Sequence, residues 1–166
     1  MRARRLGDDP DDEKGGANIP SARNGCQSRR ASLAVRGRSL DRLLLVCLGG
    51  AVGTGARYLV ALWAPRLLGT AFPYGTLLVN ALGSFLLGAL MHVGLSTTLV
   101  SPTLRLVLAT GVMGGFTTYS TFNYETTQYL RDGAWALAAL NLGGTVTVCL
   151  LAGALGLAGA RWLVGS

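Results

Sequence analysis

The chain has 166 residues, of which half are hydrophobic and only 14% are charged. Beyond residue 42 the charged residues are few: Arg57, Arg66, Arg105, Glu125, Arg131, Asp132 and Arg161. So few charges cannot solvate the surface of a water-soluble globule, so an ordinary soluble domain is excluded and an integral membrane protein in a lipid bilayer is predicted. Most of the positive excess lies in the N-terminal tail and at the ends of apolar segments, so it does not indicate nucleic acid as a partner.

Four apolar segments follow a polar tail. Residues 1–38 are rich in Asp, Arg, Gly and Ser and are expected to form a disordered tail. Residues 39–166 are expected to form an all-α transmembrane domain, because each apolar segment is long enough to cross about 30 Å of hydrocarbon. The predicted spans are about residues 43–63, 75–95, 104–130 and 135–162.

The first span contains a glycine-rich stretch, Gly49 to Gly55, that ends near Arg57. It lacks the GxGxxG spacing and the preceding strand of a dinucleotide loop, so nucleotide binding is excluded. Gly49 and Gly53 form a GxxxG face that favours close helix packing. For Arg57 two interpretations stay open: a side chain that snorkels to the headgroups, or an electropositive vestibule that attracts anions.

The second span places Thr76, Asn80 and Ser84 one turn apart, so these polar side chains share one helix face. Such a stripe can hydrogen-bond a neighbouring helix. It can equally line a polar pathway, because amide and hydroxyl hydrogens replace water around an anion.

The third span combines Gly114 and Gly115 with four hydroxyl residues within positions 117–121. These residues propagate a helix poorly, so we predict a break in the middle of the span. Backbone groups freed at membrane depth must face protein, water or an ion, and broken transmembrane helices are recurrent ion sites. Tyr119 and Phe122 are three residues apart and can present electropositive ring edges to an anion.

Further polar positions follow the predicted break. Glu125 is a functional candidate as an intramembrane carboxylate, unless the helix ends there and the carboxylate is in water. In the fourth span, Asn141 and Thr145 share a face and can serve packing. Four spans put both termini on the same side, and the arginine distribution favours the cytoplasm for them.

Four segments in this order give the chain a strong resemblance to the CrcB/Fluc family of small fluoride channels. They are GGAVGTGARY, YGTLLVNALGSFLLG, GVMGGFTTYSTFNYE and a last span with NLGGT. The resemblance covers residues 43–163 and implies a passive, fluoride-selective channel of the plasma membrane that exports fluoride from the cytoplasm. It implies no enzymatic activity.

The resemblance also implies an assembly and a set of site residues. The assembly is an antiparallel dimer, either a homodimer or a heterodimer with a paralogous subunit, with pores at the interface. Gly114 and Thr117 would coordinate a structural sodium ion through their backbone carbonyls. The positions expected to line the fluoride path or its vestibule are Asn80, Tyr119, Ser120, Phe122, Thr145, Arg57 and Glu125. Tyr119 departs from the usual phenylalanine, but its ring edge is preserved.

The same residues bear on three rival functions. A proton-coupled small multidrug transporter would need a carboxylate in the first span, which has none. A membrane enzyme would need a constellation of nucleophile, base or metal ligands, which the sequence does not offer. A non-conducting structural subunit stays open to a flux measurement.

Overall fold

The computed structural model describes residues 22–164, with the side-chain surroundings of residues 39–164, and every long element in this range is helical. No strand occurs among these residues, which confirms the predicted all-α class. Residues 1–37 and 38–166 form two units, and all predicted spans lie in the second. The helices, in chain order, are α1 (Ala22–Leu68), α2 (Tyr74–Ser96), α3 (Pro102–Leu106), the π-helix η1 (Val107–Met113), α4 (Gly114–Phe116), α5 (Tyr119–Arg131) and α6 (Trp135–Val164).

In the described part of the chain, three helical stretches are long and apolar enough to cross a membrane: Ser39–Leu68, Tyr74–Ser96 and Trp135–Val164. The predicted third span is the series α3, η1, α4 and α5, whose members are each too short to span alone. The expected arrangement of three continuous spans and one broken span is therefore confirmed.

The first span is longer than expected at its C-terminal end. The helix continues through Pro65 to Leu68, whereas the predicted span ends at about residue 63. A proline near a helix end removes one backbone donor only, so the last turn can form. Gly69 then ends the helix with a φ of 84°, and its N–H donates to the Pro65 carbonyl at 3.0 Å.

The predicted disordered tail is only partly within the described residues. Residues 1–21 lie outside them, while helix α1 already begins at Ala22. A helix at residues 22–38 differs from the expected disorder. Extending a helix from an existing span avoids the cost of nucleation, and no proline interrupts residues 22–64.

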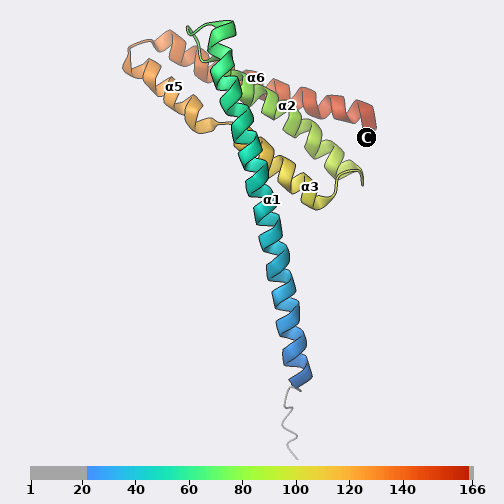
Figure 1. The fold of residues 1–166 in the computed structure, drawn as a ribbon. Coiled ribbons are helices and arrows are strands. Elements are labelled where there is room, and N and C mark those ends of the chain that lie inside the picture. Colours follow the sequence, from blue (N-terminus) through green and yellow to red (C-terminus); the bar gives the residue numbers. More distant parts are fainter. Residues whose placement is uncertain (1–21, 165–166) are drawn as a thin grey trace, which may run out of the picture. The chain divides into compact units, whose positions relative to one another are not determined.

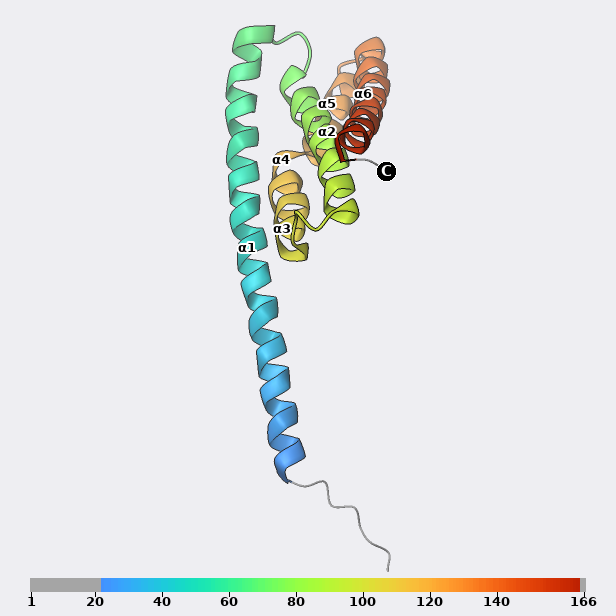
Figure 2. The ribbon, with the colours of Figure 1, turned by 90° about the vertical axis from the view of Figure 1, so that its right-hand side faces the viewer.

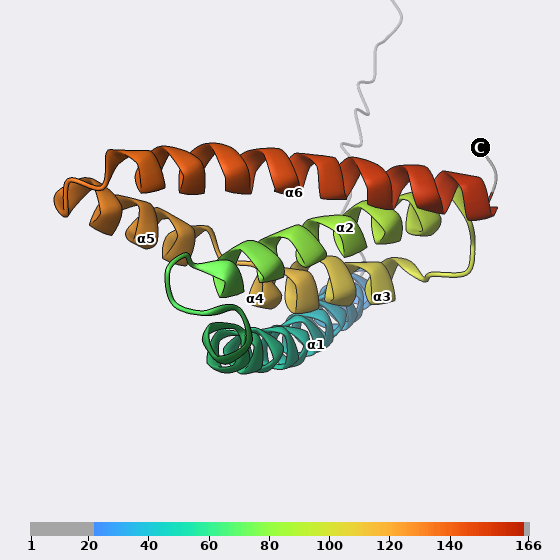
Figure 3. The ribbon, with the colours of Figure 1, turned by 90° about the horizontal axis from the view of Figure 1, so that it is seen from above.

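Helix α2 lies at the centre of the second unit. Figures 2 and 3 show α2 between α6 and the α3–α4 segment, with the spanning part of α1 on the other side of that segment. Helix α5 leaves the break and runs along α6 (Figure 1). The backbones approach closely at glycines: a Cβ at Gly156 would meet the Phe85 carbonyl, and one at Gly53 would meet the Val112 carbonyl. Small residues thus let these helices pack without intervening side chains.

Candidate functional site

The third span breaks at Thr117 and Thr118. Helix α4 ends at Phe116, Thr117 has φ −80° and ψ 155°, and Thr118 has φ −148° and ψ 105°, which are extended conformations. Helix α5 then begins at Tyr119, and the Thr118 hydroxyl caps it by accepting from the Thr121 N–H at 3.2 Å. The break predicted from the glycines and hydroxyl residues is therefore present at the expected position.

Asn80 of α2 binds both backbone groups of Thr118. The Thr118 N–H donates to Asn80 Oδ1 at 2.7 Å, and Asn80 Nδ2 donates to the Thr118 carbonyl at 3.1 Å. Thr118 is only 7% exposed, so water gives these groups little help. The side-chain amide of Asn80 therefore replaces the helical partners that the break removes, and one of its two amide hydrogens remains for another acceptor.

Arg57 of α1 binds the break from the other side. Its Nε donates to the Gly115 carbonyl at 3.0 Å. In an unbroken helix this carbonyl would accept from the N–H of Tyr119, four residues on. Arg57 is half-buried, so its guanidinium does not simply extend into solvent.

Carbonyls at the break remain open, among them those of Gly114 and Thr117. Within the described part of the chain, no hydrogen bond reaches the carbonyl oxygens of Gly114 and Thr117. Gly114 is exposed, so its backbone is accessible from outside this chain. Carbonyl oxygens of this kind are suitable ligands for a hard cation such as sodium.

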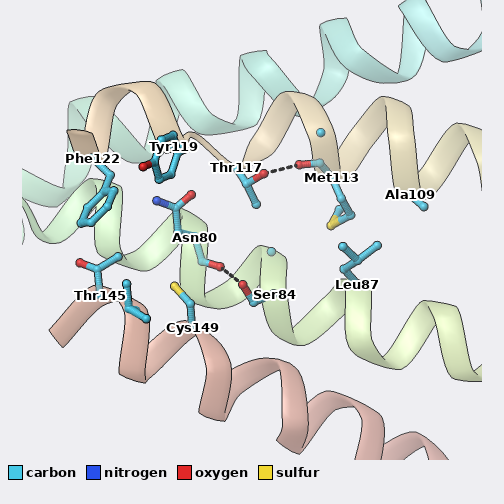
Figure 4. A pocket seen from close by; sticks show the side chains of 13 residues that line it. Asn80, Ser84, Leu87, Ala109, Met113, Thr117, Tyr119, Phe122, Thr145 and Cys149 are labelled. Carbon is cyan, nitrogen blue, oxygen red and sulfur yellow. Dashed lines mark hydrogen bonds between the residues drawn. The ribbon is translucent and has the colours of Figure 1, made fainter. Parts of the chain in front are cut away.

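A pocket of about 370 Å³ adjoins the break (Figure 4). Asn80 and Ser84 reach it from α2, Tyr119 and Phe122 from α5, and Thr145 and Cys149 from α6; Gly114 and Thr117 line it as well. The structure thus brings together six of the predicted site residues: Asn80, Gly114, Thr117, Tyr119, Phe122 and Thr145.

The two aromatic rings differ in their surroundings. Their centroids are 5.8 Å apart and their planes are tilted by 54°. Phe122 is buried, whereas Tyr119 is 77% exposed and stands at the mouth of the pocket. A tilted pair of this kind can direct ring edges, which carry partial positive charge, toward the same space.

Most hydroxyl hydrogens in the pocket are already donated within the chain. Ser84 donates to the Asn80 carbonyl at 2.7 Å, Thr117 to the Met113 carbonyl at 3.0 Å, and Thr145 to Asn141 Oδ1 at 3.3 Å. A hydroxyl group has one hydrogen, so these three groups present mainly oxygen lone pairs.

Glu125 and Arg57 lie outside this pocket. Glu125 lines a separate cavity of about 290 Å³ with Thr76 and Tyr129. The Thr76 hydroxyl donates to its Oε1 at 2.6 Å, while Oε2 is buried with no partner in the described part. Arg57 lines a small cavity of about 70 Å³ that also includes Thr118.

Ser120 does not line the pocket either. It is exposed, and its hydroxyl lies 3.3 Å from that of Thr118. The carboxylate, the guanidinium and this hydroxyl are thus separated from the pocket that holds the other predicted residues.

The hydrogen-bond partners of two central residues were not predicted from the sequence. In the sequence Thr118 is one of several hydroxyl residues near the break. A threonine directly before a helix is nevertheless typical of an N-cap, which is the role that Thr118 has. Asn141 was an expected packing residue: it is 1% exposed, donates to Thr126 Oγ1 at 2.9 Å and so joins α6 to α5.

Three apolar spans and a fourth, broken span whose Gly114 and Thr117 line a pocket define a multi-pass membrane protein with an interrupted helix. Residues 44–157 match the family described as CrcB-like protein, Camphor Resistance (CrcB). The chain belongs to this family.

Several relatives are similar over nearly their whole length. A fluoride-specific ion channel FluC of Anaeromyxobacter sp. (strain K) is 57% identical over 126 residues, which are 76% of this chain and 100% of that protein. A FluC of Sorangium cellulosum (strain So ce56) is 53% identical over 125 residues, 75% of this chain and 98% of that protein. One of Geobacter sulfurreducens is 49% identical over 124 residues, 75% of this chain and 100% of that protein. The resemblance drawn from the sequence is confirmed, and so is the expectation of a protein that is not an enzyme.

Proposed function

We propose that this protein is a passive, fluoride-selective channel that exports fluoride across the plasma membrane. The observation that supports this best is the pocket beside the break, in a chain that is 57% identical to a named fluoride-specific ion channel. Fluoride enters cells as neutral HF and dissociates inside, so a passive path for the anion lowers its internal concentration.

The pocket offers the donors that such a path needs. Fluoride is small and strongly hydrated, so its water must be replaced by hydrogen-bond donors or positive ring edges. Asn80 keeps one free amide hydrogen, and Tyr119 and Phe122 supply ring edges at the same place. Thr145 lines the pocket with its oxygen, since its hydrogen is donated to Asn141.

Two residues outside the pocket would act at the ends of the path. The positive charge of Arg57 would raise the local concentration of anions. Glu125 and Ser120 would belong to the route between the pocket and water, because both follow the break on α5.

We further propose a structural sodium ion held by the carbonyls of Gly114 and Thr117. The residues fit this ion, because both oxygens lack hydrogen bonds in the described part of the chain. When bound, sodium would supply a fixed positive charge beside the anion path, without a mobile charged side chain.

The working unit would be an antiparallel dimer. Gly114 is exposed and Tyr119 is 77% exposed in the single chain, on the side where a second subunit would complete the pocket. A homodimer and a heterodimer with a paralogous subunit both fit this arrangement. For a fixed orientation, the arginines near the membrane favour cytoplasmic termini.

Ion flux from liposomes tests this function. Purified protein is reconstituted, and efflux of fluoride and chloride is recorded with sodium inside and outside, and again with sodium replaced by a large organic cation. We expect rapid fluoride efflux, negligible chloride efflux and a loss of fluoride efflux without sodium. Absence of fluoride efflux under all conditions would refute the channel, and sodium-independent efflux would refute the sodium site alone.

A further inference from the structure

The Gly115 carbonyl is held by a side chain from another helix. It is one of the backbone groups that the break releases, and Arg57 Nε lies 3.0 Å from it. The Thr54 hydroxyl also addresses this oxygen, at a longer distance of 3.5 Å. If Arg57 only supplied charge to a vestibule, a hydrogen bond from its Nε would not be required, because the terminal guanidinium nitrogens are the ones that reach water.

The packing of α1 brings Arg57 within reach. Gly50, Gly53 and Arg57 are spaced i, i+3 and i+7, so they share one helix face. A Cβ placed on Gly115 would meet the Gly50 carbonyl, so the backbones of α1 and α4 are in contact there. The short distance between backbones means that the middle of the Arg57 side chain, and not its tip, lies beside the break.

We propose that Arg57 is a positioning residue that holds the helix break through the hydrogen bond from Nε to the Gly115 carbonyl. This inference deepens the proposed function and rests on it. Asn80 holds Thr118 from α2 and Arg57 holds Gly115 from α1, so the break is fixed from two sides within one chain. The Gly115–Phe116 peptide unit, which is planar and rigid, is thereby held next to the peptide unit that carries the Gly114 carbonyl.

Two uncharged substitutions separate the hydrogen bond from the charge. In Arg57→Gln the amide nitrogen occupies the same place along the side chain as Nε, so the donor is kept while the charge is lost. In Arg57→Met a methyl group occupies that place, so the length is kept while donor and charge are both lost. Arg57→Lys keeps the charge and moves the donor one atom further out.

Two measurements on the full-length protein read out these variants. The first is fluoride efflux from liposomes. The second is amide hydrogen exchange over residues 114–121 of purified protein, with α6 as an internal reference. We expect efflux of Arg57→Gln to exceed that of Arg57→Met at least tenfold. We also expect faster exchange over residues 114–121 in Arg57→Met, with α6 unchanged.

The opposite outcomes overturn the inference. If Gln and Met reduce efflux equally while Lys retains it, the residue acts through its charge. If all three variants keep efflux and exchange, the hydrogen bond has no role. Should only Arg57→Met fail to fold, the donor is again responsible, because Gln is equally uncharged and of similar length. If the unaltered protein carries no fluoride, the channel proposal fails, and the exchange comparison still decides the role of Arg57.

Discussion

Among the described residues, Asn80 is the only one whose side chain binds both backbone groups of Thr118, and replacing it by alanine removes this pairing. The Thr118 N–H donates to Asn80 Oδ1 at 2.7 Å, and its carbonyl accepts from Nδ2 at 3.1 Å. Alanine is a good helix former, so helix α2 itself is not weakened by the change. The effect on stability therefore reports the pairing at the break.

The loss can be bounded from both sides. Hydrogen bonds between transmembrane helices contribute about 0.6 kcal/mol on average, which gives about 1 kcal/mol for two. A buried backbone group left without a partner costs about 1 to 3 kcal/mol, which gives about 2 to 6 kcal/mol for two. Thr118 is only 7% exposed and lies outside a helix, so substitute partners are scarce. We therefore expect a loss of about 3 kcal/mol in the free energy of unfolding.

Reversible unfolding in mixed detergent micelles measures this change. Asn123→Ala is the matched control, because Asn123 is exposed on α5 and its side chain makes no hydrogen bond within the described residues. The control should change stability by less than about 0.5 kcal/mol. If Asn80→Ala costs no more than Asn123→Ala, the break does not depend on Asn80 and the reasoning is refuted.

Three further substitutions test separate parts of the structure. Tyr119→Phe should retain fluoride efflux from liposomes, because Tyr119 is 77% exposed and its ring edge is unchanged; loss of efflux would assign a necessary role to the hydroxyl. Thr76→Val should lower the free energy of unfolding by about 1 to 3 kcal/mol, because it removes the hydroxyl that donates to Oε1 of Glu125 at 2.6 Å. Thr76→Ser keeps this hydroxyl and should leave the free energy of unfolding unchanged. Gly156→Ala should reduce the yield of folded protein in size-exclusion chromatography, because its Cβ would strike an α2 carbonyl, whereas Gly159→Ala meets nothing within 4 Å and should be tolerated.

The spans and the break were predictable because they depend on local chemistry. The apolar segments are long enough to cross a bilayer in any packing arrangement. The Gly114–Gly115 pair followed by hydroxyl residues weakens a helix wherever it occurs. The turn after the third span depends on local chemistry as well, because Gly133 has a φ of 72°, a conformation that favours glycine.

Other features depend on how the helices are aligned with one another, which the sequence does not encode in a single segment. The π-helix η1, which precedes α4 and the break, has no distinctive composition. The partner of Arg57 is 58 residues away in sequence, at Gly115. Glu125 follows Thr118 by about two helical turns and lines a different cavity, where the Thr76 hydroxyl of α2 donates to its carboxylate.

The carbonyls of Gly114 and Thr117 both lose their helical donors to side chains. In a continuous helix the Gly114 carbonyl would accept from the Thr118 N–H, and the Thr117 carbonyl from the Thr121 N–H. Here Asn80 accepts from the first N–H and the Thr118 hydroxyl accepts from the second. Glycines alone would let the helix bend but would leave these donors free to bind the carbonyls again. The side chains that capture the donors therefore belong to the proposed cation site together with the carbonyls themselves.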